Sequence, residues 1–460
     1  MTGKADAVRA VTQQFKDRTN TVIGGVMAHL RDDNAKEILG PGLSPLIGRG
    51  SLKSIVTFAL YTAILRLVRE SLGLRTQSMP HIFFHILQVL IFVLLVESTA
   101  LAQIPSLDKP ARIDKSEGDT DTALYLSAVG TAKAVMLFVD FPDAPAHQSE
   151  TQPIASHLMG NGDVQRFFKE QSSGKMSLDV TIVNGWKRMP KPIAQYVNNK
   201  GLFSWDEHKA YISDACALFE QLNFAPYQIV YVVAAKTPTI RLSPAFHAWP
   251  GTGVKTPTGE IRHAATFGFD SYSNRCTTLI HETGHILGLP DLYGLNGQPS
   301  TVGTWELMCD IFTGTSFCGW HRHKLGWLDD NRKAYLATGT LRTLLTPLST
   351  AKGVSMIVVP EGNPEHPAKV FCIELAQPVL GPRNELGGQG VLIYSVDARI
   401  KTGDLPVVLY SRMPPQDNKC YHAPFQAGDT FDDPSLPMTV KILNASPKGY
   451  QVLVTKKKGK

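Results

Sequence analysis

The run His281-Glu282-Thr283-Gly284-His285 combines residue types that bind a metal ion and move protons. On a helix, two histidines four residues apart project from the same face, where both imidazoles can reach one ion. Glu282 lies beside them, placed to hold a metal-bound water and take its proton. The pattern predicts a zinc hydrolase site. The alternative, an ordinary amphipathic helix with these residues by coincidence, is disfavoured by the residues that follow.

A zinc ion that catalyses hydrolysis needs three protein ligands and one open position. Gly288 can end the helix in a left-handed conformation, so that the chain turns back and brings Asp291 toward the same ion. A competing third ligand is Glu306, which opens an E-x-x-x-D layout similar to that of thermolysin-type zinc sites. Spacing allows either acid, and the place of Gly288 favours Asp291.

The predicted site is therefore one Zn2+ held by His281, His285 and Asp291, with Glu282 as the catalytic base. A calcium ion is compatible with such a protein, but no calcium site can be derived from the sequence. Met308 is expected either in a methionine-containing turn beneath the histidines or simply in the core. Tyr293 is expected to be structural, with polarisation of a substrate carbonyl as the alternative.

The elements that must position these residues alternate between helix and strand. Apolar runs at 132–141 and 228–235 predict buried strands, residues 163–174 predict a helix ending at Ser-Ser-Gly, and 176–186 predict an alternating strand. Ser204 and Glu207 have the spacing of a capping box at the start of another helix. The expected fold class is α+β, with a zincin-like metallopeptidase domain at 123–335.

After residue 336 the sequence changes to short β runs separated by Gly/Pro turns. The six runs, near 355–362, 368–375, 390–396, 407–411, 438–443 and 450–455, predict a β-sandwich-like C-terminal domain over 336–460. Residues 103–122 are polar and charged, and they are expected to form a linker.

The beginning of the chain indicates export. An apolar run at 82–96 is followed by Ala100 and Ala102 in the small-x-small pattern of a signal-peptidase site, so residues 79–102 are interpreted as a signal peptide. Residues 1–78 are then a leader of doubtful status, consistent with an over-extended gene model that should start at Met79. The protein is expected to be secreted and to meet a membrane only transiently through the signal segment.

Six cysteines follow that segment, at 216, 276, 309, 318, 372 and 420. An even number in an oxidising compartment predicts three disulfides, although the sequence does not choose among the pairings.

From residue 103 onward the chain has 35 basic and 33 acidic residues, so the net charge of +6 resides mostly in the leader. A nucleic-acid partner is therefore not expected.

The stretch from His281 to Asp291 resembles the immune inhibitor A family of secreted zinc metallopeptidases, with a metzincin-like HExxHxxGxxD motif. It also resembles the one-domain protease snapalysin, but further landmarks favour the larger family: FVDFPD at 138–143, FFKEQSSGKMSLDVTIVNGW at 167–186, WELM at 305–308 and GWHRHKLGWL at 319–328. FCIEL, GQGVLIYSVD and FQAGDTF resemble its following β region. The likeness covers roughly residues 130 to 455.

The resemblance implies that His281 and His285 bind zinc and that Glu282 is the catalytic base. Many members continue with Asp-Glu-Tyr, whereas this chain has Asp291-Leu292-Tyr293. If a relative used that glutamate as a ligand, Leu292 could not replace it, and Asp291 would have to suffice.

The expected function is hydrolysis of internal peptide bonds in protein or peptide substrates by a secreted zinc metalloendopeptidase. Two alternatives remain open at this point. One is a zinc hydrolase of non-peptide amides or esters, and the other is a binding or adhesion protein with a vestigial peptidase domain. The intact Glu282 argues against the latter. The oligomeric state is not predicted.

Overall fold

The computed structural model describes residues 103–110, 115–147, 151–274, 276–294, 298, 301–312, 316–376, 389–413 and 420–457. The predicted leader at 1–78 and signal peptide at 79–102 lie outside the described residues. Within the described ranges, no helix is both long and apolar enough to cross a lipid bilayer.

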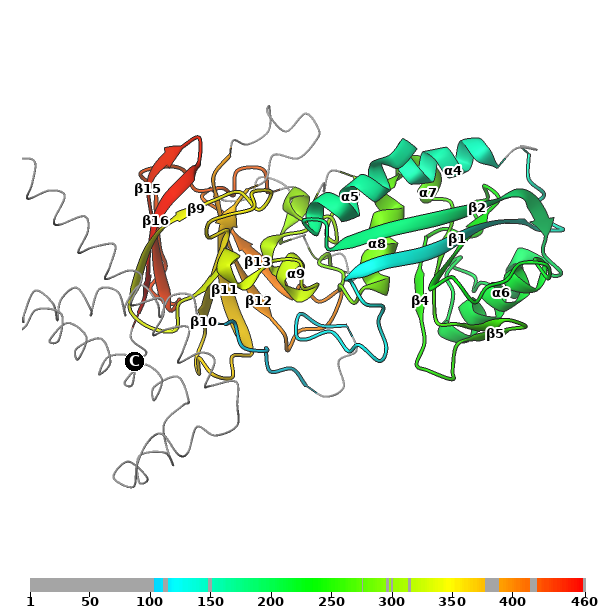
Figure 1. Ribbon diagram of the computed structural model, residues 1–460, viewed down its shortest axis with the longest axis horizontal. Helices are drawn as coiled ribbons and strands as arrows, with labels where there is room; N and C mark the ends of the chain where they lie inside the picture. Colours follow the sequence, from blue (N-terminus) through cyan, green and yellow to red (C-terminus); the bar gives the residue numbers. More distant parts are fainter. Residues whose placement is uncertain are drawn as a thin grey trace, which may run out of the picture. The chain divides into compact units, whose positions relative to one another are not determined.

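The described part of the chain is mixed α+β, in agreement with the coarse prediction. Its first sheet has the strand order β2-β1-β3-β7-β4. The first four strands in this order run parallel to one another, as β1 and β2 do side by side in Figure 1. The last strand, β4, pairs with β7 antiparallel. The bounds of these strands are β1 Gly130–Asp140, β2 Met176–Arg188, β3 Ile229–Ala234, β7 His263–Phe267 and β4 Ala245–His247.

Helices cover both faces of this sheet, which explains why its central strands are apolar throughout. In β1, Met136 and Phe138 pack into one core with α4, α5 and α8, whereas Val135 and Leu137 pack into a second core with α6. The helices are α4 Gln152–Met159, α5 Asp163–Gln171, α6 Trp205–Ala217, α7 Ser271–Asn274 and α8 Cys276–Ile286. A small hairpin is formed by β5 Val254–Thr256 and β6 Gly259–Ile261.

The predicted helix starts and strands in this region are confirmed. Ser204 caps α6: its side chain accepts a hydrogen bond from the backbone of Glu207, and the Glu207 carboxylate accepts one from the backbone of Ser204. The apolar run at 132–141 forms β1, and its residues from Ala134 to Asp140 are all buried. Local periodicity was therefore sufficient to place these elements.

All six β runs predicted after residue 336 form strands. They belong to two sheets with the orders β13-β12-β11-β10-β8 and β14-β15-β16-β9, which enclose a third apolar core between them. The strands are β8 Lys333–Tyr335, β9 Thr340–Leu345, β10 Met356–Pro360, β11 Lys369–Leu375, β12 Val391–Asp397, β13 Val407–Tyr410, β14 Thr430–Asp432, β15 Met438–Ser446 and β16 Gly449–Lys456.

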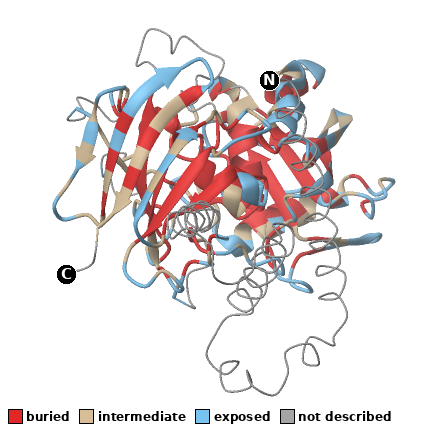
Figure 2. Ribbon diagram, turned by 60° about the vertical axis from the view of Figure 1, so that its left-hand side comes forward, coloured by how far each residue is buried: buried red, intermediate tan, exposed pale blue. Residues whose placement is uncertain are grey.

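The other face of β10, β11 and β12 belongs to the same core as α8, so these strands are buried on both sides (Figure 2). The short helix α9, Gly319–Lys324, packs against β11. The described parts of the segment treated above as a linker, 103–110 and 115–122, contain residues packed into the body. Ile104 and Leu107 belong to this core, and Glu117 is 1% exposed.

The three predicted disulfides are not formed, because none of the six cysteines, all of which lie in the described ranges, is part of a disulfide. Their number is even, but their placement is unfavourable. Cys216 lies on α6 in the second core, whereas Cys318 and Cys372 lie in the first core on the opposite side of the first sheet. An even number of cysteines was therefore not a sufficient basis for predicting disulfides.

Candidate metal centre

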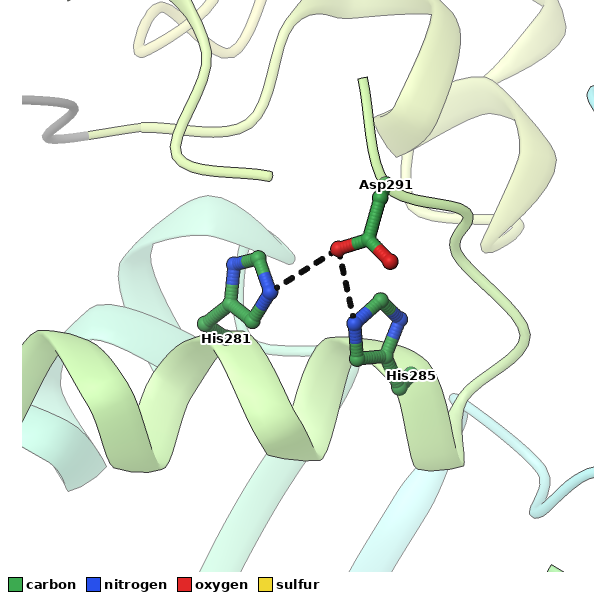
Figure 3. Close-up of side chains that lie close together, drawn as sticks. All are labelled: His281, His285 and Asp291. Carbon is green, nitrogen blue, oxygen red and sulfur yellow. Dashed lines mark hydrogen bonds and ion pairs between the residues drawn. The ribbon is translucent and has the colours of Figure 1, made fainter. Parts of the chain in front are cut away.

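His281 and His285 project from the same face of α8, as their spacing predicts, and Asp291 lies over both rings (Figure 3). A single oxygen, Oδ1 of Asp291, is 3.2 Å from Nε2 of His281 and 3.1 Å from Nε2 of His285. The two imidazole rings are 4.7 Å apart between centroids and nearly perpendicular. These atoms converge on one point above the helix.

The other ring nitrogen of each histidine faces a backbone carbonyl. Nδ1 of His281 is 3.3 Å from the oxygen of Leu307, and Nδ1 of His285 is 2.8 Å from the oxygen of Leu289. If each Nδ1 carries the proton and donates to its carbonyl, each Nε2 presents a lone pair to the shared point. This second contact orients a metal-binding histidine and selects its tautomer.

These three residues fit a zinc ion in chemistry and in spacing. Two imidazole nitrogens and one carboxylate oxygen are ligands that zinc accepts, and ligands about 2.1 Å from a tetrahedral zinc are about 3.4 Å apart. The contacts from Asp291 to the two rings are close to that separation. His281, His285 and Asp291 would hold the ion and leave a fourth position for water or substrate.

Gly288 makes the turn that returns the chain to the histidines. Its φ is +96°, and its amide donates to the carbonyl of His285, which ends α8. A Cβ on this residue would also lie 2.7 Å from the side chain of Thr120. The left-handed turn inferred from the sequence is thus present, and a side chain would be excluded by both backbone strain and contact.

Asp291 is held in place from a distant part of the chain. Its backbone amide donates to Oγ1 of Thr402 at 2.8 Å, and its carbonyl accepts from the amide of Gly403 at 3.3 Å. The Thr402 hydroxyl also lies 3.4 Å from Oδ2 of Asp291. The amide of Thr402 in turn donates to the carbonyl of Lys115. Segments on both sides of the predicted peptidase domain therefore orient the third ligand.

Glu282 is buried, 5% exposed, on the same helix as the two histidines. Burial raises its pKa to about 8, and the neighbouring Asp291 acts in the same direction, while His281 and Lys115 oppose it. A carboxyl whose pKa lies near neutral pH can accept and return a proton readily. Burial thus makes this carboxylate a stronger base than an exposed glutamate would be.

The charges around the three predicted ligands shift their pKa values in different directions. Burial raises the pKa of Asp291, but the two histidines outweigh it and hold that pKa well below its usual range. Burial lowers the pKa of His281, but Asp291 and Glu282 outweigh it, so the pKa is raised. For His285 burial prevails and the pKa is lowered. Asp291 is thus anionic at neutral pH.

Met308 lies in a buried turn that packs against α8. The amides of Cys309 and Asp310 both donate to the carbonyl of Glu306, and the Met308 sulfur packs so closely on Gly284 that a Cβ there would be 2.7 Å from it. Gly284 lies on α8 between the two histidines. The methionine is therefore both a core residue and part of a turn beside the metal-binding helix.

Tyr293 lies next to the site. Its ring is 6.3 Å from that of His281 and inclined by 21° to it. Burial, followed by the negative charges of Asp291 and Glu282, raises its pKa, so the hydroxyl keeps its proton. A neutral phenol at this place can donate a hydrogen bond, which is compatible with either expectation for Tyr293.

Glu306, the competing third ligand, is not placed with His281 and His285. It is fully buried among Cys318 and His321, and its Oε1 is 3.2 Å from Nδ1 of His321. Sequence spacing alone could not separate it from Asp291. The structure brings Asp291, not Glu306, to the histidines of α8.

Two residues that help to position Asp291, Thr402 and Lys115, were not identified from the sequence. Thr402 lies 111 residues after Asp291, and Lys115 lies 176 residues before it. Neither has a motif of its own. Only an internal pairing signal between 115–116 and 401–402, which form a bridge in the structure, could have pointed to them.

The comparisons with known proteins add no assignment. No protein-family model matches this chain, and no curated protein matches it significantly in sequence. The case for a function therefore rests on the residues and geometry of the site itself.

Proposed function

We propose that this chain is a secreted zinc metalloendopeptidase that hydrolyses internal peptide bonds of proteins. The observation that carries the proposal is the convergence of two Nε2 atoms and one carboxylate oxygen, from His281, His285 and Asp291, beside the buried Glu282. The immune inhibitor A-like landmarks support the same class. A zincin-like fold for the first sheet and its helices is part of the proposal.

A zinc ion bound by these ligands would polarise the scissile carbonyl and make a water molecule more acidic. Glu282 would take a proton from the water as its oxygen bonds to the carbonyl carbon, and would deliver that proton to the leaving amine as the peptide C–N bond breaks. With Nδ1 of His281 and of His285 facing the carbonyls of Leu307 and Leu289, the Nε2 atoms would be the ones left to bind the ion. Asp291 contributes negative charge that balances the cation.

The first sheet offers a place for an extended peptide. In the described residues β4 is an edge strand, and α8 packs against it. The backbone amide of Ala248 donates to the carbonyl of Arg262, and the carbonyl of Pro244 accepts from the amide of Thr266. The backbone N–H and C=O of Phe246 therefore point to β7, and those of Ala245 point to the open edge. A peptide could pair there as an added strand. This supports a peptide substrate over a small ester.

The proposal is tested with the purified full chain and casein. Chelation should abolish hydrolysis, and zinc should restore it. Glu282→Gln should retain zinc but lower kcat by about 100- to 10,000-fold, since the base is lost while the three ligands remain. Glu170→Gln, an exposed glutamate on α5, is the matched control. Casein hydrolysis that survives in Glu282→Gln would refute the mechanism, and a zinc-loaded wild type inert toward casein and a peptide library would refute the endopeptidase.

A further inference from the structure

A second group of metal-binding side chains lies deep in the first core, separate from the histidines of α8. Glu306, Cys318 and His321 each offer one donor atom, and these atoms lie within 4.8 Å of one another. All three residues are buried, and the side chain of His321 is fully enclosed. The proposed catalytic mechanism uses none of them.

Two of the three residues come from one short sequence. Cys318-Gly319-Trp320-His321 has Cys-x-x-His spacing, with Cys318 immediately before α9 and His321 in its first turn. Residues three apart at this place can direct their side chains to one point. A thiolate, an imidazole and a carboxylate are all ligands that zinc accepts, and together they would fill three of its four positions.

The hydrogen bonds around His321 are those of a metal-binding histidine. Its Nε2 lies 3.1 Å from Oε1 of Glu117, a buried carboxylate on the far side of the ring. Its Nδ1 is directed toward Glu306 but makes no hydrogen bond there, despite the 3.2 Å separation. A carboxylate that accepts a proton from the outer nitrogen, while the inner nitrogen faces other donors, is the usual support of a zinc-bound histidine.

Buried charges of both signs lie around Cys318 and His321. Three are carboxyl groups, from Glu117, Glu306 and Glu374, and they outnumber the buried guanidinium of Arg322. One oxygen of Glu117 has no hydrogen-bond partner. Cys318 presents its sulfur to the same point as Glu306 and His321, and a zinc ion would bind that sulfur as a thiolate.

We propose that Glu306, Cys318 and His321 form a second, structural zinc site, with Glu117 orienting His321. Such an ion would fix the turn that begins at Glu306. That turn supplies the Leu307 carbonyl facing Nδ1 of His281 and the Met308 sulfur packed on α8. The second site would thus support the first without touching substrate. The inference does not depend on what reaction the first site performs.

Cobalt substitution separates the two sites. Of the two sites only the second has a sulfur ligand, so a thiolate-to-cobalt charge-transfer absorption in the near ultraviolet that depends on Cys318 reports on the second site. The full chain loaded with Co2+ should show this absorption, and so should the variant His281→Ala/His285→Ala. Cys318→Ser should lose it and bind one equivalent of zinc fewer than wild type. Cys216→Ser, a buried thiol in the other core, should keep both.

A wild-type protein that binds cobalt without this absorption would overturn the proposal, and this measurement does not require any variant to fold. An unchanged zinc content in folded Cys318→Ser would also overturn it. Loss of casein hydrolysis in Glu282→Gln has no bearing on either result, so failure of the proposed peptidase activity and failure of the second site can be told apart.

Discussion

Oδ1 of Asp291 lies 3.1 Å from Nε2 of His285, although five residues, among them the left-handed Gly288, separate the two along the chain. The same oxygen also faces Nε2 of His281. Because the contact depends on the turn at Gly288, the third ligand is a product of local backbone conformation. This is why a sequence pattern of only eleven residues carries most of the site.

Asp291→Ala should therefore lose the catalytic zinc. Loss of a residue that only hydrogen-bonds to a metal ligand can weaken metal affinity by roughly 100-fold, and removal of one of the three ligands themselves should weaken zinc binding by more than that. Zinc affinity and casein hydrolysis should fall together. Glu170→Gln, the exposed glutamate on α5, is the comparison and should keep both. If Asp291→Ala keeps its catalytic zinc and its activity, the choice of Asp291 is wrong.

Thr402 should influence zinc binding without touching the ion. Its hydroxyl accepts from the Asp291 amide and reaches toward the carboxylate. Thr402→Val keeps the shape but removes these contacts, so zinc affinity should fall by about 10- to 100-fold. Thr402→Ser retains the hydroxyl and should remain close to wild type. Metal competition titrations on the three proteins provide the measurement, and equal affinities would exclude a positioning role for this hydroxyl.

Tyr293→Phe distinguishes the two expectations for that residue. If the phenol donates a hydrogen bond to the developing oxyanion of the substrate, kcat should fall on the order of 100-fold. KM and zinc content should stay near their wild-type values, because Tyr293 is not a predicted ligand. A variant with full kcat but reduced thermal stability would show that the tyrosine is structural.

The elements that could be predicted from sequence are those specified by neighbouring residues. Helix periodicity placed His281 and His285 on one face, the capping box placed the start of α6, and apolar runs placed β1 and β3. Each of these signals lies within about a dozen residues. The turn at Gly288 belongs to the same class.

The features that escaped prediction depend on contacts between distant segments. Thr402 reaches Asp291 across 111 positions, and Glu117 reaches His321 across 204. No local pattern marks such pairs in a single sequence. The Cys-x-x-His spacing at Cys318 was visible, but its partner Glu306 was interpreted as a rival ligand for the first site. The even number of cysteines, likewise, did not indicate which thiols lie close together.

Burial of His208 predicts a loss of stability in mild acid. This residue lies on α6, 4% exposed, with Nε2 2.9 Å from Oγ1 of Thr266. Burial lowers its pKa to about 3, whereas in an unfolded chain a histidine titrates near 6.5. Below pH 6.5 the unfolded state binds a proton that the folded state does not, so folding stability present above that pH is lost as the pH falls toward 3.

The contribution of this one group is a slope of about 1.4 kcal/mol for each pH unit in that window. Glutamine in His208→Gln cannot titrate. The free energy of unfolding of this variant should therefore fall less steeply between pH 6 and pH 4, and the slope should be smaller by about 1.4 kcal/mol for each pH unit. Urea denaturation at several pH values, in the Glu282→Gln background to prevent self-digestion, measures it. The exposed His366→Gln controls for loss of an imidazole. Parallel slopes for wild type and His208→Gln would contradict the prediction and would mean that His208 becomes protonated in the folded protein.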